Sequence, residues 1–145
     1  MRTFVALLGG LLLAGLVHAE NATRAGGYTI HHNALTTDSL SPQVAQAYGI
    51  QRSTSRGMIN VTVVRDKEGT AGTPVTAQIQ LDAHNLIGQK RDDIRLREVR
   101  EGNAVYYIAD FPVANREHLT FDLDVIPQGE THALHARFDQ EFFTR

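Results

Sequence analysis

Apolar and polar residues alternate along most of the chain after residue 27. In VTAQIQLDAH, residues 75–84, every second side chain is apolar and those between are polar. An extended strand directs successive side chains to opposite faces, so this pattern predicts a strand with one face in the core and one in water. HLTFDLDVIP, residues 118–127, repeats the pattern. It ends at Pro127, which has no N–H to donate to a neighbouring strand.

Seven segments of this kind predict an all-β protein. Turn-forming residues separate them, and EGN, residues 101–103, is typical of a tight hairpin in which Gly102 takes a positive φ. Seven short strands favour a two-sheet antiparallel sandwich of immunoglobulin-like type, with a small closed β-barrel as the alternative. The Cys…Trp…Cys core of antibody domains is absent from the sequence, so the prediction concerns architecture only. The expected strands are 28–37, 57–66, 75–84, 92–101, 103–111, 118–127 and 131–143.

One segment, SPQVAQAYGIQRS at residues 41–53, has the pattern of a helix instead. It contains an N-cap residue, a proline suited to the first turn and a glycine suited to the C-terminus: Ser41, Pro42 and Gly49. Val44, Ala45 and Tyr48 fall on one side of such a helix. We therefore expect one short helical connector between the first two strands, crossing an end of the sandwich with Val44 and Tyr48 buried as a plug.

A second interpretation of this connector is functional. Tyr48, Arg52 and Arg56 would form the rim of a binding site at that end of the sandwich. Loops held by a rigid scaffold are where such sites usually lie. Arg52 would hold an acidic group of a partner, or in the structural interpretation it would pin the connector to a nearby carboxylate or carbonyl.

The N-terminus has the three parts of a secretory signal. Arg2 is followed by an apolar run at residues 4–17 and then by Val17-His18-Ala19, which predicts cleavage before Glu20. The apolar run is shorter than the roughly 20 residues that span a bilayer. We therefore expect residues 1–19 to be removed and residues 20–145 to form a single domain. This domain is expected to be periplasmic and not embedded in the membrane.

Composition excludes several classes of function. The chain has 14 Lys and Arg against 16 Asp and Glu, a net charge of −2, and shows no basic face of the kind that binds nucleic acid. It has no cysteine, which rules out disulfides, thiol catalysis and thiolate metal sites. The stability of the fold must therefore come from packing.

Four blocks carry a resemblance to a known family. They are residues 28–53 (YTIHHNALTTDSLSPQVAQAYGIQRS), 59–64 (INVTVV), 106–113 (YYIADFPV) and 120–130 (TFDLDVIPQGE). They resemble an uncharacterised family of small exported proteins of Gram-negative bacteria, domain of unknown function 4426, and the most specific block is Asn33–Ser53. The resemblance covers nearly the whole chain after the leader. It implies a periplasmic, mostly β protein and supplies no activity, cofactor or catalytic residue.

The histidines offer no local metal chelate. Adjacent strand residues face opposite sides of a sheet, and so do residues three apart, so neither His31-His32 nor the pair in HALH can chelate one ion. A non-local site such as His32 with His132 remains open, because both share the parity of inward-facing residues. Met58 stands alone, without the cluster that a copper site needs. We expect neither a specific metal site nor a cofactor.

The charged pairs favour structure over catalysis. Asp122 and Asp124 lie on one face of a predicted strand, about 7 Å apart along it, as do Arg95 and Arg97 on another. Paired carboxylates serve in glycosidases, but alternating charges on the wet face of a sandwich more commonly form cross-strand ion pairs. The sequence thus predicts no catalytic residue.

These observations favour a non-enzymatic binding or accessory module, with another envelope protein as its partner. One alternative is a carrier of a small ligand or metal that uses the end of the sandwich near Tyr48 and Arg52. An enzyme is the third alternative, and it would need a cleft with convergent polar groups.

Overall fold

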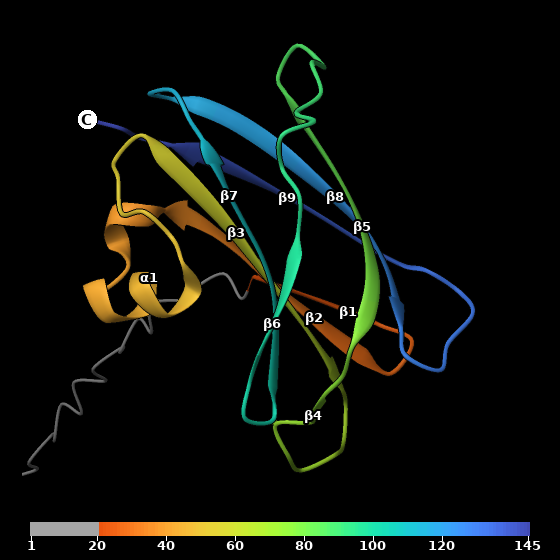
Figure 1. Ribbon diagram of the computed structural model, residues 1–145. Helices are drawn as coiled ribbons and strands as arrows, with labels where there is room; N and C mark the ends of the chain where they lie inside the picture. The colour runs from red at the N-terminus through yellow and green to blue at the C-terminus, as the bar shows by residue number, and fades with distance from the viewer. Residues whose placement is uncertain (1–20) are drawn as a thin grey trace, which may run out of the picture.

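The computed structural model describes residues 21–145, so the predicted leader, residues 1–19, lies outside the described residues. The described part contains nine strands, one 3-10 helix and one α-helix (Figure 1). The strands are β1 (Ala22–Ala25), β2 (Tyr28–Thr36), β3 (Arg56–Arg65), β4 (Thr73–Pro74), β5 (Ala77–Asn85), β6 (Arg97–Glu101), β7 (Ala104–Pro112), β8 (Glu117–Pro127) and β9 (Leu134–Phe142). The connector between β2 and β3 contains η1 (Thr37–Ser39) and α1 (Pro42–Tyr48).

The strands form two separate antiparallel sheets. The larger sheet has the order β1-β2-β3-β7-β6, with β4 beside β3, and the smaller sheet has the order β5-β8-β9. Without the short β1 and β4, the chain order is first-second-fifth-fourth in one sheet and third-sixth-seventh in the other. This is the arrangement of a constant-type immunoglobulin domain. The predicted sandwich is confirmed, and the two sheets do not close into a barrel.

All seven predicted strands form, the short strands β1 and β4 were not predicted, and the other differences lie at strand margins. The segment 92–96 was expected to belong to β6, but that strand begins only at Arg97. The reason is that this segment carries the chain from one sheet to the other. The N–H of Arg91 still bonds to the carbonyl of Ala83 on β5 (2.9 Å), and Ile94 turns inward and is buried. The hairpin between β6 and β7 turns at Gly102, with φ 57°, as predicted.

The main core fills the space between the sheets, as the alternation predicts. On β8 the inward residues Leu119, Phe121, Leu123 and Val125 are all fully buried. On the facing sheet, β3 contributes Ile59, Val61 and Val63 and β7 contributes Phe111. Burial of these side chains is the dominant stabilising contribution in a chain without disulfides.

Five aromatic rings form a continuous series through this core. His32 stacks on Phe138 (ring centroids 4.4 Å apart), and Phe138 stacks on Phe121 (5.0 Å). Phe121 contacts Phe111 (6.1 Å), which meets the edge of Phe142 (5.8 Å). His32 is 6% exposed and lies at one end of the series. It is therefore part of the core and not a surface ligand.

The helix α1 has the ends that the sequence predicts. The Ser41 hydroxyl accepts the N–H of Val44 (3.2 Å), Pro42 begins the helix, and Gly49 ends it in the left-handed conformation with φ 66°. Within residues 21–145, no helix has the length and apolar character needed to cross a membrane.

The position of the connector corrects one prediction. It packs on the outer face of the larger sheet and does not close the end of the sandwich (Figure 1). Val44, expected in the core, is 39% exposed, and Ala45 is the buried residue of the helix. Tyr48 is only half buried. The physical reason is that Met58 and Ile108 point away from the main core and need an apolar cover of their own, which the connector supplies.

Candidate binding groove

The outer face of the larger sheet is divided into two parts. One part lies under the connector, where Ile50, Met58 and Ile108 form a small second core with Leu35, Leu40, Tyr48, Val99 and Tyr106 at its margin. The other part, over β1, β2 and the far half of β3, is polar. The predicted rim residues Tyr48, Arg52 and Arg56 belong to the first part.

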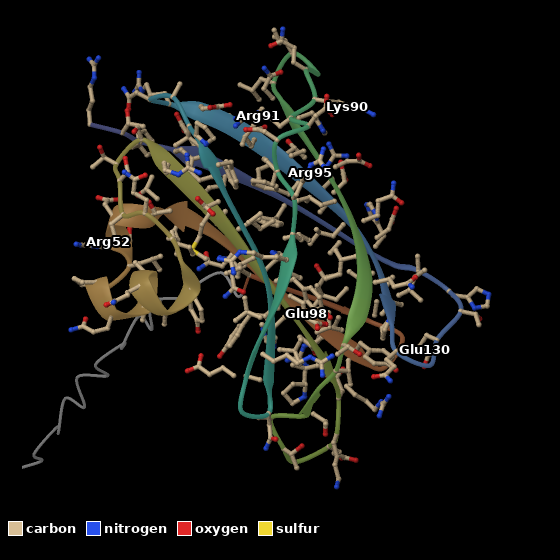
Figure 2. The ribbon with its side chains drawn as sticks, in the orientation of Figure 1. Arg52, Lys90, Arg91, Arg95, Glu98 and Glu130 are labelled. Carbon is tan, nitrogen blue, oxygen red and sulfur yellow. The ribbon has the colours of Figure 1, made fainter. Side chains whose placement is uncertain are left out.

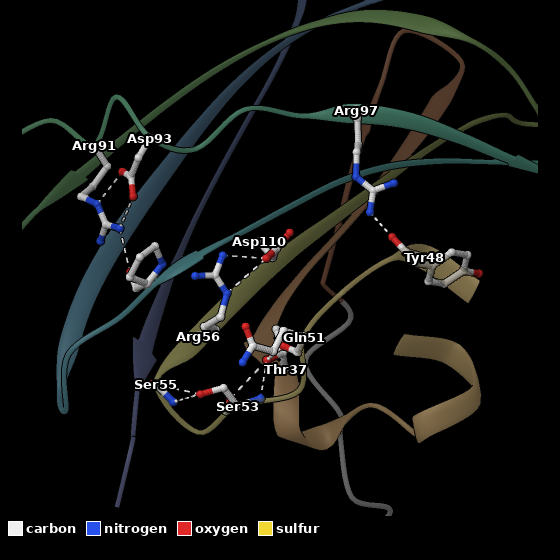
Figure 3. A network of polar contacts seen from close by, with 11 residues as sticks. Thr37, Tyr48, Gln51, Ser53, Ser55, Arg56, Arg91, Asp93, Arg97 and Asp110 are labelled. Carbon is white, nitrogen blue, oxygen red and sulfur yellow. Dashed lines mark hydrogen bonds and ion pairs between the residues drawn. The ribbon is translucent and has the colours of Figure 1, made fainter. Parts of the chain in front are cut away.

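Tyr48 is held by its neighbours on the sheet. Its hydroxyl donates to Glu101 Oε2 (2.8 Å), and its ring lies 6.1 Å from that of Tyr106. The hydrogen bond to Glu101, with burial as a second cause, raises the pKa of Tyr48 to about 12. Arg97 on β6 also donates to the Tyr48 carbonyl (Figure 3). The end of α1 is thus fastened to β6.

Arg52 links two parts of the connector to each other. Its guanidinium donates to the carbonyls of Leu40 (2.7 Å) and Asp38 (3.1 Å), which matches the structural role considered from the sequence. A second fastening comes from the fully buried Thr37 (Figure 3). Its hydroxyl donates to the carbonyl of Gln51 (2.8 Å) and accepts the N–H of Ser53 (2.9 Å).

Arg56 is paired within the sheet. Its Nη2 and Nε atoms both contact Asp110 Oδ2 on β7, at 2.7 and 3.2 Å (Figure 3). Tyr48, Arg52 and Arg56 therefore each have a partner within the protein. Tyr48 and Arg52 hold the connector in place, whereas Arg56 links β3 to β7.

The polar part of the outer face is hollowed. One hollow of about 300 Å³ lies over β2 and β3, and a second of about 470 Å³ lies towards β1 and the loop after β3. Both are lined by His31, so we treat them as one groove. The residues named below as the groove are Arg24, Thr29, His31, Asn33, Asn60 and Thr62.

The floor of the groove is built from cross-strand pairs. His31 lies opposite Thr62, and Asn33 lies opposite Asn60, in the antiparallel register of β2 and β3. All four side chains lie on the same face of the sheet as Met58 and so point away from the main core. Asn60 Oδ1 is shielded from solvent and has no hydrogen-bond partner among residues 21–145. A shielded amide oxygen without a partner is costly, so rotation of the Asn60 side chain towards the hollow would let it accept a hydrogen bond from a ligand.

The loop after β3 forms one wall of the groove. Thr29 is buried beneath it, and the Thr29 hydroxyl donates to Asp66 Oδ1 (2.6 Å). The loop bends back onto β3 at Gly72, where φ is 80°. A Cβ atom there would lie 2.4 Å from Val64 Cγ1 and 2.6 Å from the Arg65 carbonyl, so only glycine fits. The wall is therefore a defined structure and not a loose flap.

The remaining candidates lie elsewhere. The outer face of the smaller sheet carries Asp122 and Asp124, and His135 contacts both, at 3.5 Å and 3.0 Å. His84 on β5 and Arg137 on β9 also lie within 3.9 Å of Asp122. These are the cross-strand ion pairs expected from the sequence. His132 is exposed and contacts Thr131, while His32 is buried, and residues 21–145 contain no group of three potential ligands that could hold a metal ion.

Sequence reasoning missed the groove and the role of Thr37. A partial signal existed, since GMINVTVVRD has polar Asn60 and Thr62 between apolar outward positions at Met58 and Val64. That mixed face indicates a surface that is covered in one part and wet in another. Thr37 gave no signal, because a threonine after a strand is common.

Comparison with known proteins supports the fold and names a family. Residues 22–145 match the family model of DUF4426, a domain of unknown function. The crystal structure of a DUF4426 family protein from Pseudomonas aeruginosa PAO1 is similar, with 34% sequence identity and a TM-score of 0.68. The similarity covers 84% of this chain and 93% of that one. A search of the curated proteins finds no match.

Proposed function

The chain belongs to the DUF4426 family, whose description carries no activity, and we propose that it is a non-enzymatic binding or accessory module of the bacterial periplasm. Its groove holds a polar segment of another envelope protein. The observation that carries this proposal is the shielded Asn60 Oδ1, which has no partner within residues 21–145 and lies at the floor of a hollow.

The chemistry of the groove supports a polar occupant. Asn33 and Asn60 each offer an amide donor and an amide acceptor, and Thr62 and His31 add further hydrogen-bonding groups. An extended peptide presents N–H and carbonyl groups at regular intervals, so side-chain amides on two neighbouring strands can bond to its backbone. Arg24, at the β1 end of the groove, suits an acidic side chain of such a segment.

A binding role also agrees with the rigidity of the surroundings. The floor consists of paired strands, and the connector beside it is fastened by Thr37, Arg52 and Tyr48. A preformed surface loses little conformational entropy when it binds a partner. A site at the connector is less favoured, because the polar groups of Tyr48, Arg52 and Arg56 already have intramolecular partners.

Export is part of the proposal. Arg2, the apolar run at 4–17 and Val17-His18-Ala19 support removal of residues 1–19. Mass spectrometry of the protein recovered from its host should find Glu20 as the first residue. A form that begins at Met1 would contradict this part of the proposal.

Photo-crosslinking in the host cell tests the groove. A photoreactive amino acid at His31, which is exposed in the groove, should give a defined adduct with an envelope protein. The same amino acid at Gln80, exposed on the smaller sheet, is the matched control and should give no such adduct.

A second variant makes the test specific. Asn33→Arg fills the groove with a long side chain at an exposed position, so the His31 adduct should disappear while the thermal midpoint is unchanged. If the adduct persists, or if Gln80 gives the same adduct, the groove is not the binding site.

A further inference from the structure

The turn after β5 exposes two large aliphatic side chains. Leu86 is 77% exposed and Ile87 is 79% exposed, more than Phe143 (55%) and Val44 (39%). Two adjacent aliphatic residues so fully in water are unusual on a folded domain, and such features mark sites of interaction. The turn projects beyond both sheets, at the top of Figure 1. We call residues 85–89 the aliphatic tip.

The aliphatic tip is rigid. Asn85 Oδ1 accepts the N–H groups of Ile87 (3.2 Å) and Gln89 (2.9 Å), and Asn85 Nδ2 donates to Gln89 Oε1 (2.9 Å). The backbone N–H of Asn85 bonds to the Gln89 carbonyl (3.0 Å), and that of Gly88 bonds to the Asn85 carbonyl (3.0 Å). Five hydrogen bonds therefore hold Leu86 and Ile87 outward. This turn geometry directs Leu86 and Ile87 away from both sheets, in agreement with their exposure.

Further apolar surface lies at the same end of the smaller sheet. Asn85 pairs with Leu119 on β8, and Phe142 on β9 pairs with Glu117. Phe143, the next residue, is therefore close to the level of the aliphatic tip. A shallow hollow of about 260 Å³ lies between Leu86, Ile87, Glu117 and His118. Leu86 and Ile87 thus lie at the same end of the smaller sheet as Phe143, although β8 separates β9, which Phe143 follows, from β5.

The charge at this end differs from that of the whole chain. Segments 85–95, 114–118 and 141–145 contain five basic and four acidic residues, whereas the whole chain has 14 basic and 16 acidic ones. Arg91 pairs with both Asp93 (2.7 Å) and Glu117 (2.8 Å), and this group of three side chains keeps a net charge of −1. The three segments together have a net charge of +1, against −2 for the whole chain. Lys90 and Arg116 form no ion pair among residues 21–145 and are exposed. Figure 2 shows Lys90 and Arg91 at the base of the turn, with Arg95 below them.

From these observations we propose that the aliphatic tip docks on the surface of an anionic phospholipid bilayer. A convex aliphatic tip needs apolar surroundings that adapt to its shape, and the hydrocarbon boundary of a bilayer provides them without a preformed pocket. Lys90 and Arg116 lie where they can meet lipid phosphates when Leu86 and Ile87 enter the interface. The inference does not depend on the groove, which lies on the larger sheet.

Vesicle flotation tests the proposal. Residues 20–145, which contain both sheets and the whole core, are mixed with vesicles of phosphatidylcholine alone or with phosphatidylglycerol added. The protein should float with the anionic vesicles. The variant Leu86→Ser/Ile87→Ser should bind them roughly tenfold more weakly or worse, since two aliphatic side chains then no longer leave water. Val44→Ser, which removes an exposed apolar side chain from α1, is the matched control and should bind like wild type.

A second variant separates the charge contribution. Lys90→Gln/Arg116→Gln should keep the fold and lose most of the preference for phosphatidylglycerol, and added salt should have the same effect on wild type. The proposal is overturned if wild type binds no vesicle, or if the Leu86→Ser/Ile87→Ser variant binds as well as wild type. It is also overturned if sedimentation velocity shows that the tip mediates self-association while vesicles stay unbound, since a second copy is then the occupant.

Discussion

The two faces of the larger sheet are covered in different ways: the inner face by the smaller sheet, and part of the outer face by the connector. The inner face is mostly apolar, with His32 as a buried polar residue, and packs on the smaller sheet through residues such as Ile59, Val61 and Phe111. The outer face is covered by the connector over Met58 and Ile108 and is open over His31, Asn33 and Asn60. The same strands, β2 and β3, contribute to both faces.

The difference shows that alternation alone specifies only one of these faces. On the inner face the central strands β3 and β7 have an apolar residue at every second position, so no particular loop is needed to complete the core. On the outer face the small core exists only because the connector folds back onto the sheet. That return is fixed by single contacts, including Arg52 to the Leu40 carbonyl and Thr37 to the Gln51 carbonyl.

The largest expected effect comes from breaking the inner face. Phe111→Ala removes a fully buried ring that contacts Phe121 and Phe142. We expect a loss of about 4 kcal/mol in the free energy of unfolding, because the cavity cannot collapse among paired strands. Urea denaturation measures it. Phe143→Ala, one residue beyond β9 and largely exposed, is the control and should cost less than about 0.5 kcal/mol.

A smaller effect is expected on the outer face. Tyr48→Ala removes a half-buried ring and its bond to Glu101, and we expect a loss of about 2 kcal/mol. The loss should be local, because the Tyr48 ring packs on the second core and not on the main core. Hydrogen exchange should therefore accelerate at the Ile50 amide, which bonds to the Ala45 carbonyl, and much less in β8. A loss equal to that of Phe111→Ala would show that the connector and the main core unfold as one unit.

The third prediction concerns His32, on the inner face of β2, and the dependence of the free energy of unfolding on pH. Burial, with the neighbouring His31 as a second cause, lowers the pKa of His32 from its usual 6.5. The folded protein then binds fewer protons than the unfolded chain below pH 6.5, so stability should fall as the pH decreases from 6.5 through the lowered value. His32→Phe, which keeps a ring against Phe138, should flatten this dependence in urea midpoints measured across that range.

The control for His32→Phe is a substitution at an exposed histidine. His132→Gln changes an exposed ring in the loop between β8 and β9 and should leave the pH dependence as in wild type. If His32→Phe and wild type lose stability in parallel as the pH falls, the buried ring is not the group responsible.

Much of the fold could be predicted because it depends on local patterns. All seven predicted strands form. The helix α1 begins at Ser41 and Pro42 and ends at Gly49, as expected. The burial of Val44 was predicted wrongly, since helical periodicity gives the relative positions of side chains but not the direction from which a sheet approaches. The groove was missed for a related reason. His31 and Thr62 lie far apart in the sequence and become neighbours only through the register of β2 and β3.

By itself, the sequence determined the strands, the inward residues of the main core, the ends of the helix and the absence of disulfides, since each depends on residue type and on spacing within one segment. Only the tertiary structure decided that the connector covers part of an outer face, that Asn60 lies at the floor of a groove, and that Leu86 and Ile87 stay in water. These features depend on where separate segments meet. That is set by the packing of the whole chain, because a surface residue gains or loses its neighbours only when a distant loop comes to rest beside it.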